Sequence, residues 1–255
     1  MLTEKVGRAE LYLADCMDIM RDMPDKAFEL AIVDPPYGDG GELGKQEAEQ
    51  IRRTVRQVQH RGVNHAYGGR FERYDPPKVS RTGGTRSKKY QTEGGCPSDI
   101  RHWDFAPPPE YFKELFRVSK RQIVWGGNYF SLPPSRNFIV WRKLTISEGF
   151  SMAMAEYAWT NIPGNAKVFE CTPQGTKSKP RIHPTQKPVE LYKWILSLYA
   201  KKGDKILDTH MGSGSLEVAC VELGFDVVGI EINETYFNGA LERIKTANKQ
   251  RRLFD

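Results

Sequence analysis

The sequence predicts an α/β fold with a mostly parallel, doubly wound sheet that is interrupted by one basic insertion. Short apolar runs typical of buried strands alternate with segments of helical period. A glycine turn at residues 212–214 separates a strand from a helix, and the next strand ends in an acidic residue, as in the nucleotide-binding half of such a sheet. A chain of 255 residues can bury one core of this kind, so we expect a single domain over residues 1–255.

The elements before residue 162 follow from their apolar pattern. Residues 10–16 and 28–34 are predicted strands, and residues 17–23 between them are a predicted short helix. The apolar run at residues 30–33 is continuous, which is typical of a strand covered on both faces. We further predict a helix over residues 109–118, a strand and its turn over residues 121–127, and two more strands over residues 137–143 and 156–161.

The last third of the chain continues the alternation. A helix is predicted to begin at Pro188, which suits a first helical turn, and to end near residues 201–203. We then predict a strand and glycine turn over residues 205–215, a helix over 216–224, a strand over 225–233 and a final helix over 234–248.

Residues 39–101 break this pattern and carry most of the net charge. They contain 13 Lys/Arg and 8 Asp/Glu, which accounts for +5 of the net charge of +6. A basic segment favours a nucleic acid as partner, although a solvated charged surface has the same composition. Near the start of the segment, apolar residues recur at helical spacing with Arg52, Arg53 and Arg56 between them. We therefore predict a basic helix that contacts nucleic-acid phosphates.

The composition argues against several classes of site. The four cysteines form no C-x-x-C pair, which argues against a zinc ribbon or a redox motif, and the five histidines have no metal-ligand spacing. No metal site is therefore expected. The chain has no secretory pattern at its start and no run of the roughly 18 apolar residues that a membrane span needs. We expect a cytoplasmic protein without a membrane contact.

An unusual turn follows the predicted strand at residues 28–34, in the stretch A-I-V-D-P-P-Y-G. Pro35 and Pro36 remove two backbone donors and restrict two φ angles, so the turn is stiff and its carbonyl groups can accept hydrogen bonds. Together with the carboxylate of Asp34 and the ring of Tyr37, this predicts a site for a planar ligand that carries an amino group. The alternative is a plain strand-ending turn. The second D-P-P, at residues 75–77, lacks the apolar strand and the aromatic residue and is interpreted as an ordinary loop.

The glycine turn predicts a second site. Asp208 closes a strand, Gly212 and Gly214 allow a tight turn, and the next helix points its N-terminus at the same place. The third glycine of a G-x-G-x-x-G fingerprint is absent, because Glu217 occupies that position. Glu231 ends the next strand, where an acid can accept hydrogen bonds from ribose hydroxyls. The glycine turn and Glu231 together favour a site for an adenosyl-type ligand. The alternative is that the strand merely ends in a solvated acid.

Taken together, these motifs resemble the amino-methylating branch of the S-adenosylmethionine-dependent DNA methyltransferases. The similarity includes D-x-x-x-G-x-G at residues 208–214, G-I-E-I-N at 229–233 and H-P-T-Q-K-P at 183–188. Because D-P-P-Y precedes the cofactor glycines, the order is similar to that of the family's permuted beta group. The resemblance covers most of the chain outside residues 39–101. It implies a Rossmann-like methyltransferase fold, S-adenosylmethionine as cofactor, double-stranded DNA as partner and a bacterial or phage-encoded modification enzyme.

The chemistry that the resemblance implies explains the stiff turn. An exocyclic amino group is a poor nucleophile, because its lone pair is delocalised into the ring. The Asp34 carboxylate and the Pro35 carbonyl would each accept one N–H, which turns the lone pair toward the sulfonium methyl, and Pro36 keeps the acceptors rigid. Tyr37 would stack on the base after it has been flipped out of the duplex. The sulfonium is already an activated leaving group, so no metal is needed.

The resemblance also implies cofactor-binding residues. Asp15 matches an acidic position near the cofactor adenine, and Lys187 and Ser213 match positions near the methionine carboxylate. The whole implied set is Asp15, Lys187, Asp208, Gly212, Ser213, Gly214, Glu231 and Asn233. Family members often have Phe at the position of His210 and Thr at that of Ser215, so the packing of the cofactor is expected to differ in detail.

Family members with D-P-P-Y mostly modify adenine, so we expect the 6-amino group of adenine as the target. Cytosine enzymes more often carry Ser at the position of Asp34, which makes the 4-amino group of cytosine the first alternative. Methylation of RNA or of a protein glutamine is a second alternative, and a non-catalytic DNA-binding subunit is a third. A silent subunit would have no need to keep both Asp34 and Glu231.

The end of the chain predicts a further partner. Gln250, Leu253 and Phe254 form a Q-x-x-L-F pattern, which resembles the peptides by which bacterial DNA-processing proteins dock on the replication sliding clamp. The alternative is that Leu253 and Phe254 fold back onto the core. A homodimer is also left open.

Overall fold

The computed structural model describes residues 2–38, 106–147, 153–173 and 181–251. Its contacts divide the chain into two units, one of Met1–Tyr37 with Ala106–Asp255 and one of Gly38–Phe105. The helices and strands given below all belong to the first unit. The basic segment with Arg52, Arg53 and Arg56 lies outside the described residues, so its helix and the extent of the insertion stay predictions.

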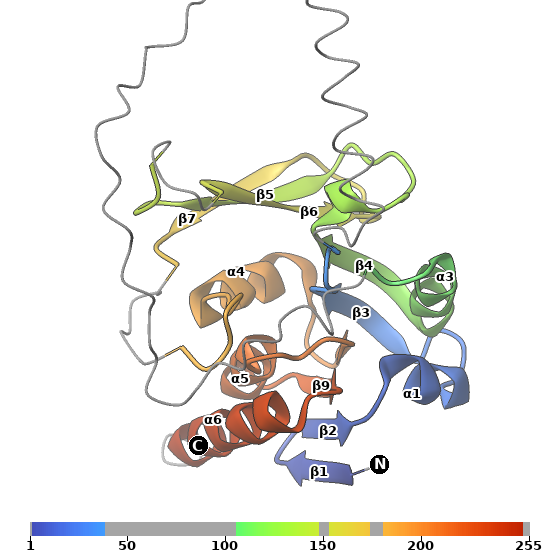
Figure 1. The fold of residues 1–255 in the computed structure, drawn as a ribbon, viewed down its shortest axis with the longest axis vertical. Coiled ribbons are helices and arrows are strands. Elements are labelled where there is room, and N and C mark those ends of the chain that lie inside the picture. Colours follow the sequence, from blue (N-terminus) through green and yellow to red (C-terminus); the bar gives the residue numbers. More distant parts are fainter. Residues whose placement is uncertain (1, 39–105, 148–152, 174–180, 252–255) are drawn as a thin grey trace, which may run out of the picture. The chain divides into compact units, whose positions relative to one another are not determined.

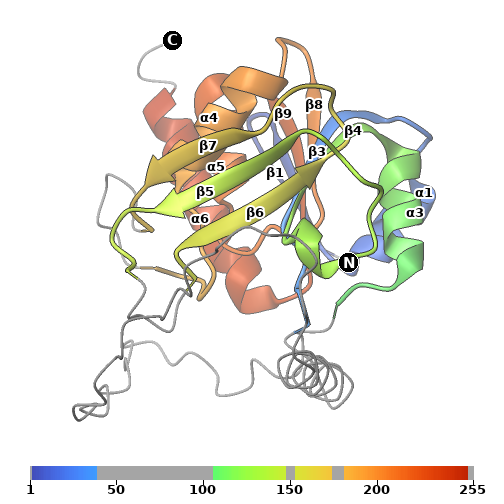
Figure 2. The same cartoon turned by 90° about the horizontal axis from the view of Figure 1, so that it is seen from above.

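The first unit is built around one nine-stranded sheet (Figure 1). In spatial order the strands are β1 (Leu2–Val6), β2 (Ala9–Leu13), β9 (Asp226–Glu231), β8 (Lys205–Asp208), β3 (Phe28–Val33), β4 (Ser119–Trp125), β6 (Ala155–Thr160), β5 (Phe138–Lys143) and β7 (Lys167–Cys171). The run from β2 to β4 is parallel throughout. Beyond it, β1 and β6 are antiparallel to their neighbours, and β7 pairs in parallel with β5 at the far edge, as Figure 2 shows from above.

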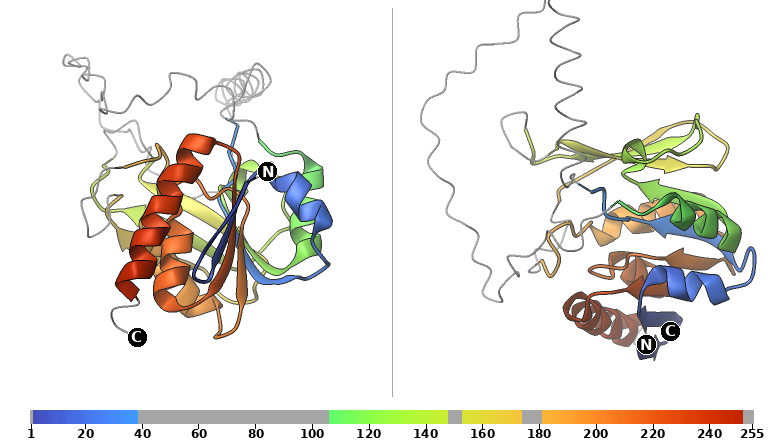
Figure 3. Two further views of the ribbon diagram at one scale, coloured as in Figure 1. Left: turned by 90° about the horizontal axis from the view of Figure 1, so that it is seen from below. Right: turned by 45° about the vertical axis from the view of Figure 1, so that its right-hand side comes forward.

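Helices cover both faces of the sheet, which confirms the doubly wound α/β prediction (Figures 1 and 3). One face carries α4 (Val189–Tyr199), α5 (Ser215–Leu223) and α6 (Glu234–Arg251), and the other carries α1 (Cys16–Asp22) and α3 (Pro109–Val118). Each face has its own apolar core. Ile195 and Phe237 belong to the first core, and Met20 and Leu115 belong to the second.

Strand β3 shows why its sequence is continuously apolar. Leu30 and Ile32 face the core under α4 to α6, whereas Ala31 and Val33 face the core under α1 and α3. All four side chains are at most 1% exposed. A central parallel strand buries both faces, so the alternation of apolar and polar residues disappears. This strand carries the D-P-P-Y turn at its carboxyl end.

Local signals set the ends of several helices. The Asp15 side chain accepts a 2.8 Å hydrogen bond from the Met17 N–H and caps α1. Pro188 immediately precedes α4, and Gly224 closes α5 with a φ of +85°, which only glycine adopts without strain. The predicted helix over residues 234–248 is correct in position but continues to Arg251.

The sequence-based prediction is wrong at both edges of the sheet, because it includes neither β1 nor β7. Both are partly exposed edge strands with charged residues, and a strand of this kind needs no long apolar run. The strand and turn predicted over residues 121–127 are both present, because β4 ends at Trp125 and a short 3₁₀ turn, η2 (Gly127–Tyr129), follows it. The described helices include none with the length and apolar character of a membrane span.

The parallel strands bring the predicted motifs to one edge of the sheet. Asp34 follows β3, Asp208 ends β8 and Glu231 ends β9, and these three strands are neighbours. Asp15 follows β2, whose last residue, Leu13, pairs with Glu231. Ligands of open α/β sheets bind at this carboxyl edge.

Candidate active site

Asp34 and Tyr37 contact each other across the two prolines. The Tyr37 hydroxyl donates a 2.8 Å hydrogen bond to Oδ1 of Asp34. Burial and the neighbouring Asp34 charge raise the pKa of Tyr37, so its hydroxyl keeps its proton and remains a donor. Pro35, within the turn, is buried. The turn therefore presents a fixed carboxylate rather than a mobile one.

The Tyr37 ring has two aromatic neighbours and one glycine neighbour. It stacks on Tyr129, with the ring centroids 4.8 Å apart and the planes at 14°, while Phe130 meets it edge-on at 6.3 Å. Gly126 adopts a φ of +66°, and a Cβ there would collide with the Tyr37 ring. Tyr129 is 61% exposed, so this aromatic cluster reaches the surface beside Asp34.

Lys187 lies against Asp34, and its Nζ forms an ion pair with Oδ2 of that carboxylate. The same Nζ is 3.2 Å from Oε2 of Glu156 and 5.0 Å from the ring centroid of Trp125. Burial opposes the charged form of Lys187, but the two carboxylates outweigh it and raise its pKa. The structure thus places Lys187 beside the D-P-P-Y carboxylate, and its expected approach to a methionine carboxylate stays a prediction.

Glu156 and Lys143 extend this ion pair inward, and sequence reasoning missed both. Lys143 Nζ is 2.6 Å from Oε1 of Glu156, on the adjacent strand. Burial disfavours the Glu156 carboxylate, yet the charges of Lys187 and Lys143 lower its pKa, so it stays ionised. A lone Glu in a predicted core strand carries no local signal of such a partner.

The glycine turn and Glu231 are joined through the backbone. The Gly212 N–H donates to one oxygen of Glu231 at 2.7 Å, and the Asn233 N–H donates to the other at 2.9 Å. Burial raises the pKa of Glu231, and these two hydrogen bonds act in the opposite direction. Each carboxylate oxygen has a second lone pair for a ligand hydroxyl. Gly214 has a φ of +69°, and a Cβ there would lie 2.9 Å from Ala240.

Asp208 is buried among other acids. Its side chain is held by the His210 N–H, which donates to Oδ1 at 3.0 Å. Burial is the main reason why the pKa of Asp208 rises to about 8, and the charges of Asp34 and Glu231 raise it further. The acids of the separate motifs therefore interact electrostatically, as expected for one continuous site.

Three other predicted residues have structural contacts in addition to any contact with a cofactor. Asn233 accepts a 3.1 Å hydrogen bond from the Tyr236 N–H at the start of α6, just as Asp15 caps α1. Ser213 Oγ lies 3.1 Å from Ser215 Oγ, and the Ser213 carbonyl accepts from Arg243. Arg243, which sequence reasoning missed, supports the glycine turn from α6.

Two histidines pack against the glycine turn in neutral form. Burial lowers the pKa of both His183 and His210 to about 4. His183 meets Tyr236 edge-on at 4.3 Å and lies beside Gly212, which links the H-P-T-Q-K-P segment to the turn. His210 Nδ1 is 2.9 Å from the Thr209 hydroxyl, a polar contact that a Phe at this position lacks.

The residues at this edge fit S-adenosylmethionine. Glu231 offers a buried carboxylate for ribose hydroxyls, and Ile232 next to it is 65% exposed, which suits a flat purine ring. The positive φ of Gly212 and Gly214 lets the backbone approach a ligand closely. Asp34 follows β3, the strand that pairs with β8 and Asp208 at the same edge. Among the described residues there is no group of metal-ligating side chains.

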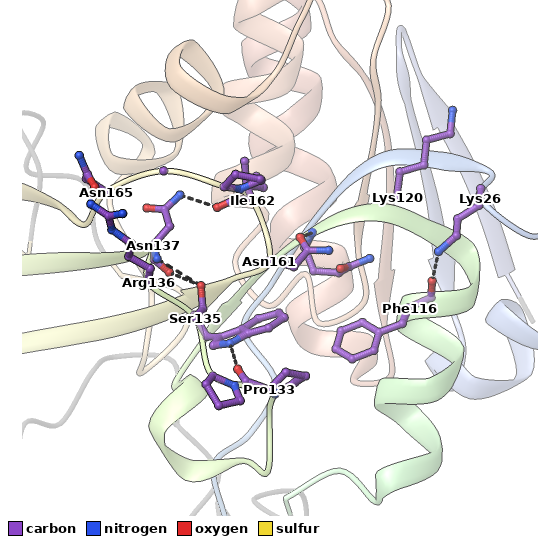
Figure 4. A pocket seen from close by; sticks show the side chains of 15 residues that line it. Lys26, Phe116, Lys120, Pro133, Ser135, Arg136, Asn137, Asn161, Ile162 and Asn165 are labelled. Atoms are coloured by element: carbon purple, nitrogen blue, oxygen red, sulfur yellow. Dashed lines mark hydrogen bonds between the residues drawn. The ribbon is translucent and has the colours of Figure 1, made fainter.

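A separate cavity of about 900 Å³ lies beside the amino-terminal half of β4, where Lys120 and Gln122 line it (Figure 4). Lys26, Phe116, Arg136 and Asn161 are among its lining residues, and it contains none of the predicted site residues. Lys26 Nζ is already bound to the carbonyls of Phe116 and Ser119. The cavity is therefore distinct from the carboxyl edge at which the motifs meet.

Two predicted contact regions stay predictions. Arg52, Arg53 and Arg56 are outside the described residues, as are Leu253 and Phe254 of the clamp-like peptide. Gln250 lies within α6, next to its last residue.

Two curated relatives have related sequences. The type II methyltransferase M.HpaI of Haemophilus parainfluenzae is 42% identical over 82 residues, which are 32% of this chain and 26% of that protein. The type II methyltransferase M2.MboI of Moraxella bovis is 23% identical over 250 residues, which are 87% of this chain and 82% of that protein. The chain thus matches about a quarter of M.HpaI and most of M2.MboI.

Solved structures share the fold. The cytosine-N4-specific PvuII DNA methyltransferase superposes with a TM-score of 0.56 at 10% identity, covering 97% of this chain and 93% of that one. The complex of M1.HpyAVI with SAM superposes with a TM-score of 0.50 at 17% identity, covering 92% and 98%. At such identities the likeness shows the Rossmann-like methyltransferase fold alone.

A family model described as a DNA methylase, of the N6/N4 methyltransferases, matches residues 86–242. The matched stretch contains Lys187, the glycine turn and Glu231, while Asp34 precedes it. This is more than half of the chain. The chain therefore belongs to the N6/N4 methyltransferase family of DNA methylases.

Proposed function

We propose that this protein transfers a methyl group from S-adenosylmethionine to the 6-amino group of adenine in double-stranded DNA. The observation that carries the proposal is the position of Asp34. Its carboxylate ends a rigid central strand and is paired with the buried Lys187. It also directly follows β3, the strand next to that of Asp208, and Asp208 precedes the glycine turn.

The geometry supports amino-group chemistry. Bound S-adenosylmethionine supplies a methyl group on a sulfonium, and the reaction forms one N–C bond and breaks one C–S bond. Within the described part of the chain, Oδ1 of Asp34 accepts only from Tyr37 and has a second lone pair for an amino hydrogen. The Pro35 carbonyl accepts the other hydrogen, and after transfer the positively charged nitrogen releases one proton to water. Both acceptors favour the pyramidal nitrogen that attacks the methyl group.

Tyr37 is proposed to bind the flipped base by stacking. Base–aromatic stacking contributes about 1–3 kcal/mol, which offsets part of the cost of unstacking the base. The Tyr37 ring is kept in place by Gly126 and by its hydrogen bond to Asp34. Tyr129 lies parallel to it and adds a second aromatic surface.

Adenine rather than cytosine is proposed because the turn begins with Asp34, whereas cytosine enzymes of the family more often begin it with Ser. The related PvuII enzyme is cytosine-N4-specific but is similar only in fold. The basic segment over residues 39–101, with Arg52, Arg53 and Arg56, is proposed to bind DNA. Restriction–modification is the proposed setting, because both curated relatives are type II methyltransferases.

Incubation of the purified protein with tritiated S-adenosylmethionine and plasmid DNA tests the proposal. After digestion to nucleosides, the label is expected in N6-methyladenine. Label in N4-methylcytosine instead would favour the cytosine alternative. Label found only with RNA or protein substrates, or no label with any, would reject the proposed function. Sequencing of the product DNA with a modification-sensitive method then locates the target site.

Asp34→Ala is the matched control for this assay. Asp34 acts on the base amino group, so transfer is expected to disappear while the dissociation constant for S-adenosylmethionine, measured by calorimetry, stays within about threefold. A variant that keeps substantial transfer would remove Asp34 from the reaction.

A further inference from the structure

Four side chains of alternating charge form a continuous chain from the D-P-P-Y turn into the sheet. Asp34 pairs with Lys187, Lys187 lies 3.2 Å from Glu156, and Glu156 lies 2.6 Å from Lys143. They come from the end of β3, the H-P-T-Q-K-P segment, β6 and β5. Distant parts of the sequence therefore meet at the proposed acceptor of the amino group.

The two ammonium groups occupy matching aromatic sites. Lys187 Nζ lies 5.0 Å from the centre of the Trp125 ring, and Lys143 Nζ lies 5.1 Å from the centre of the Trp141 ring. Both tryptophans are buried, and only 3% of the Lys187 side chain and 6% of the Lys143 side chain are exposed. Stiff surroundings of this kind restrict where each ammonium can lie.

Buried charges are tolerated only when they are compensated. The chain of four side chains contains two carboxylates and two ammonium groups, so its net charge is zero. Removing one inner partner leaves an uncompensated charge in a poorly hydrated site, which is strongly unfavourable. This balance explains why Lys143 is needed if Glu156 is to contact Lys187.

The division of contacts at Asp34 gives the four side chains a function beyond charge balance. Lys187 pairs with Oδ2, whereas Oδ1 accepts only the Tyr37 hydroxyl among the groups that the structure describes. The same ammonium lies 3.2 Å from Oε2 of Glu156, which attracts it as a second carboxylate. Without this attraction, only the packing against Trp125 limits the ammonium, and a small shift toward Oδ1 lets it compete with the target amino group.

We infer that Glu156 and Lys143 are positioning residues for methyl transfer. Lys143 fixes Glu156, and Glu156 holds the Lys187 ammonium on one oxygen of Asp34, which keeps the other oxygen available as the acceptor for the target amino group. This inference rests on the proposed function. Both residues act through Lys187 and Asp34 rather than on the base or the cofactor.

The test compares Glu156→Gln with the double variant Lys143→Met/Glu156→Gln. Glu156→Gln keeps the shape but removes the attraction for Lys187, so kcat for DNA is expected to fall about 10- to 100-fold, as for a misplaced catalytic group. The dissociation constant for S-adenosylmethionine is expected to stay within about threefold. The melting temperature of Glu156→Gln is expected to fall, because Lys143 then lacks a counter-charge.

The double variant separates positioning from stability. It removes both inner charges, so the buried net charge returns to zero and the melting temperature is expected to recover. The kcat is expected to stay low, because nothing draws Lys187 away from Oδ1. Glu170→Gln is the surface control, since the ion pair of Glu170 with Arg142 on the neighbouring strands is 47% and 65% exposed. It is expected to leave kcat and melting temperature unchanged.

Two results would overturn the inference. One is a kcat for Glu156→Gln within twofold of the wild-type value. The other is a kcat that recovers together with stability in the double variant, which indicates a purely structural contribution. A wild-type protein that methylates no amino group in DNA would instead refute the proposed function, so the two failures are distinguishable.

Discussion

The hydroxyl of Tyr37 donates a 2.8 Å hydrogen bond to the carboxylate of Asp34, so the first and last residues of the D-P-P-Y turn contact each other directly. The bond orients the aromatic ring and occupies one lone pair of the oxygen that Lys187 does not bind. In the proposed reaction, both residues act on the same base, one on its face and one on its amino group. Their mutual contact keeps the two surfaces at a fixed angle.

Tyr37→Phe and Tyr37→Ala separate the hydroxyl from the ring. The Phe variant loses a hydrogen bond with a net contribution of about 0.5–1.5 kcal/mol, so kcat/KM is expected to fall by no more than about tenfold. The Ala variant also loses base stacking of about 1–3 kcal/mol and is expected to lose far more. Steady-state kinetics with a DNA duplex measure both. Equal losses in the two variants would mean that the ring does not bind the base.

Glu231→Ala is expected to weaken the binding of S-adenosylmethionine. A ribose would lose a charged acceptor, which contributes about 1.5–3 kcal/mol, and the N–H groups of Gly212 and Asn233 would lose their partner. Calorimetry measures the dissociation constant. Asp226→Ala is the control, because Asp226 begins the same strand, is about half exposed and pairs with Arg8. Equal affinities for wild type and Glu231→Ala would remove Glu231 from the cofactor site.

Glu217→Gln is expected to change how stability depends on pH. Glu217 is fully buried, and among the described residues neither of its carboxyl oxygens has a hydrogen-bond partner. Burial, followed by the charge of Asp208, raises the pKa of Glu217 well above its usual value. The folded protein therefore retains a proton that the unfolded chain loses above about pH 4.3. The protonated Glu217 therefore contributes fully to the free energy of unfolding below that pH. This contribution is lost as the pH rises toward the pKa of Glu217 in the folded protein.

The free energy of unfolding of wild type should therefore fall with rising pH relative to that of Glu217→Gln, by up to about 1.4 kcal/mol per pH unit. Urea unfolding at pH 5, 6, 7 and 8 measures this difference. The comparison is needed because Asp208, with a pKa raised to about 8, gives both proteins a trend in the same direction. Glu242→Gln, at an exposed position of α6, is the control. A difference that is constant over this range would contradict a buried, protonated Glu217.

Neutralising Arg52, Arg53 and Arg56 is expected to weaken DNA binding, because the three side chains are proposed to bind phosphates. The slope of log K against log salt should decrease in magnitude by roughly 0.9 for each phosphate that is no longer neutralised. Fluorescence anisotropy at several salt concentrations measures the slope. Neutralising Arg21, Lys113 and Lys245, which are exposed on three helices of the sheet unit, is the matched control. A slope that changes equally in both triple variants would show only a general charge effect.

Much of the fold is predictable because its signals are local. The apolar run of β3 and the glycine turn after β8 depend on residues close together in the sequence. The edge strands β1 and β7 are not predictable in this way, because their sequences contain no long apolar run. They are strands because they pair with β2 and β5, which a local pattern does not reveal. The antiparallel place of β6 between β4 and β5 also depends on long-range pairing.

The sequence by itself determined the D-P-P-Y turn around Asp34 and the glycine turn at residues 212–214, since stiff prolines and permissive glycines act within a few residues. Only the tertiary structure decided that Lys187 contacts Asp34 and that Glu156 and Lys143 stand behind it. Asp34 and Lys187 are 153 positions apart, and no local pattern marks a Lys or a Glu as a future partner. A buried charge acquires its partner only when the sheet brings β3, β5 and β6 together, because the cost of leaving it unpaired arises only in the folded core.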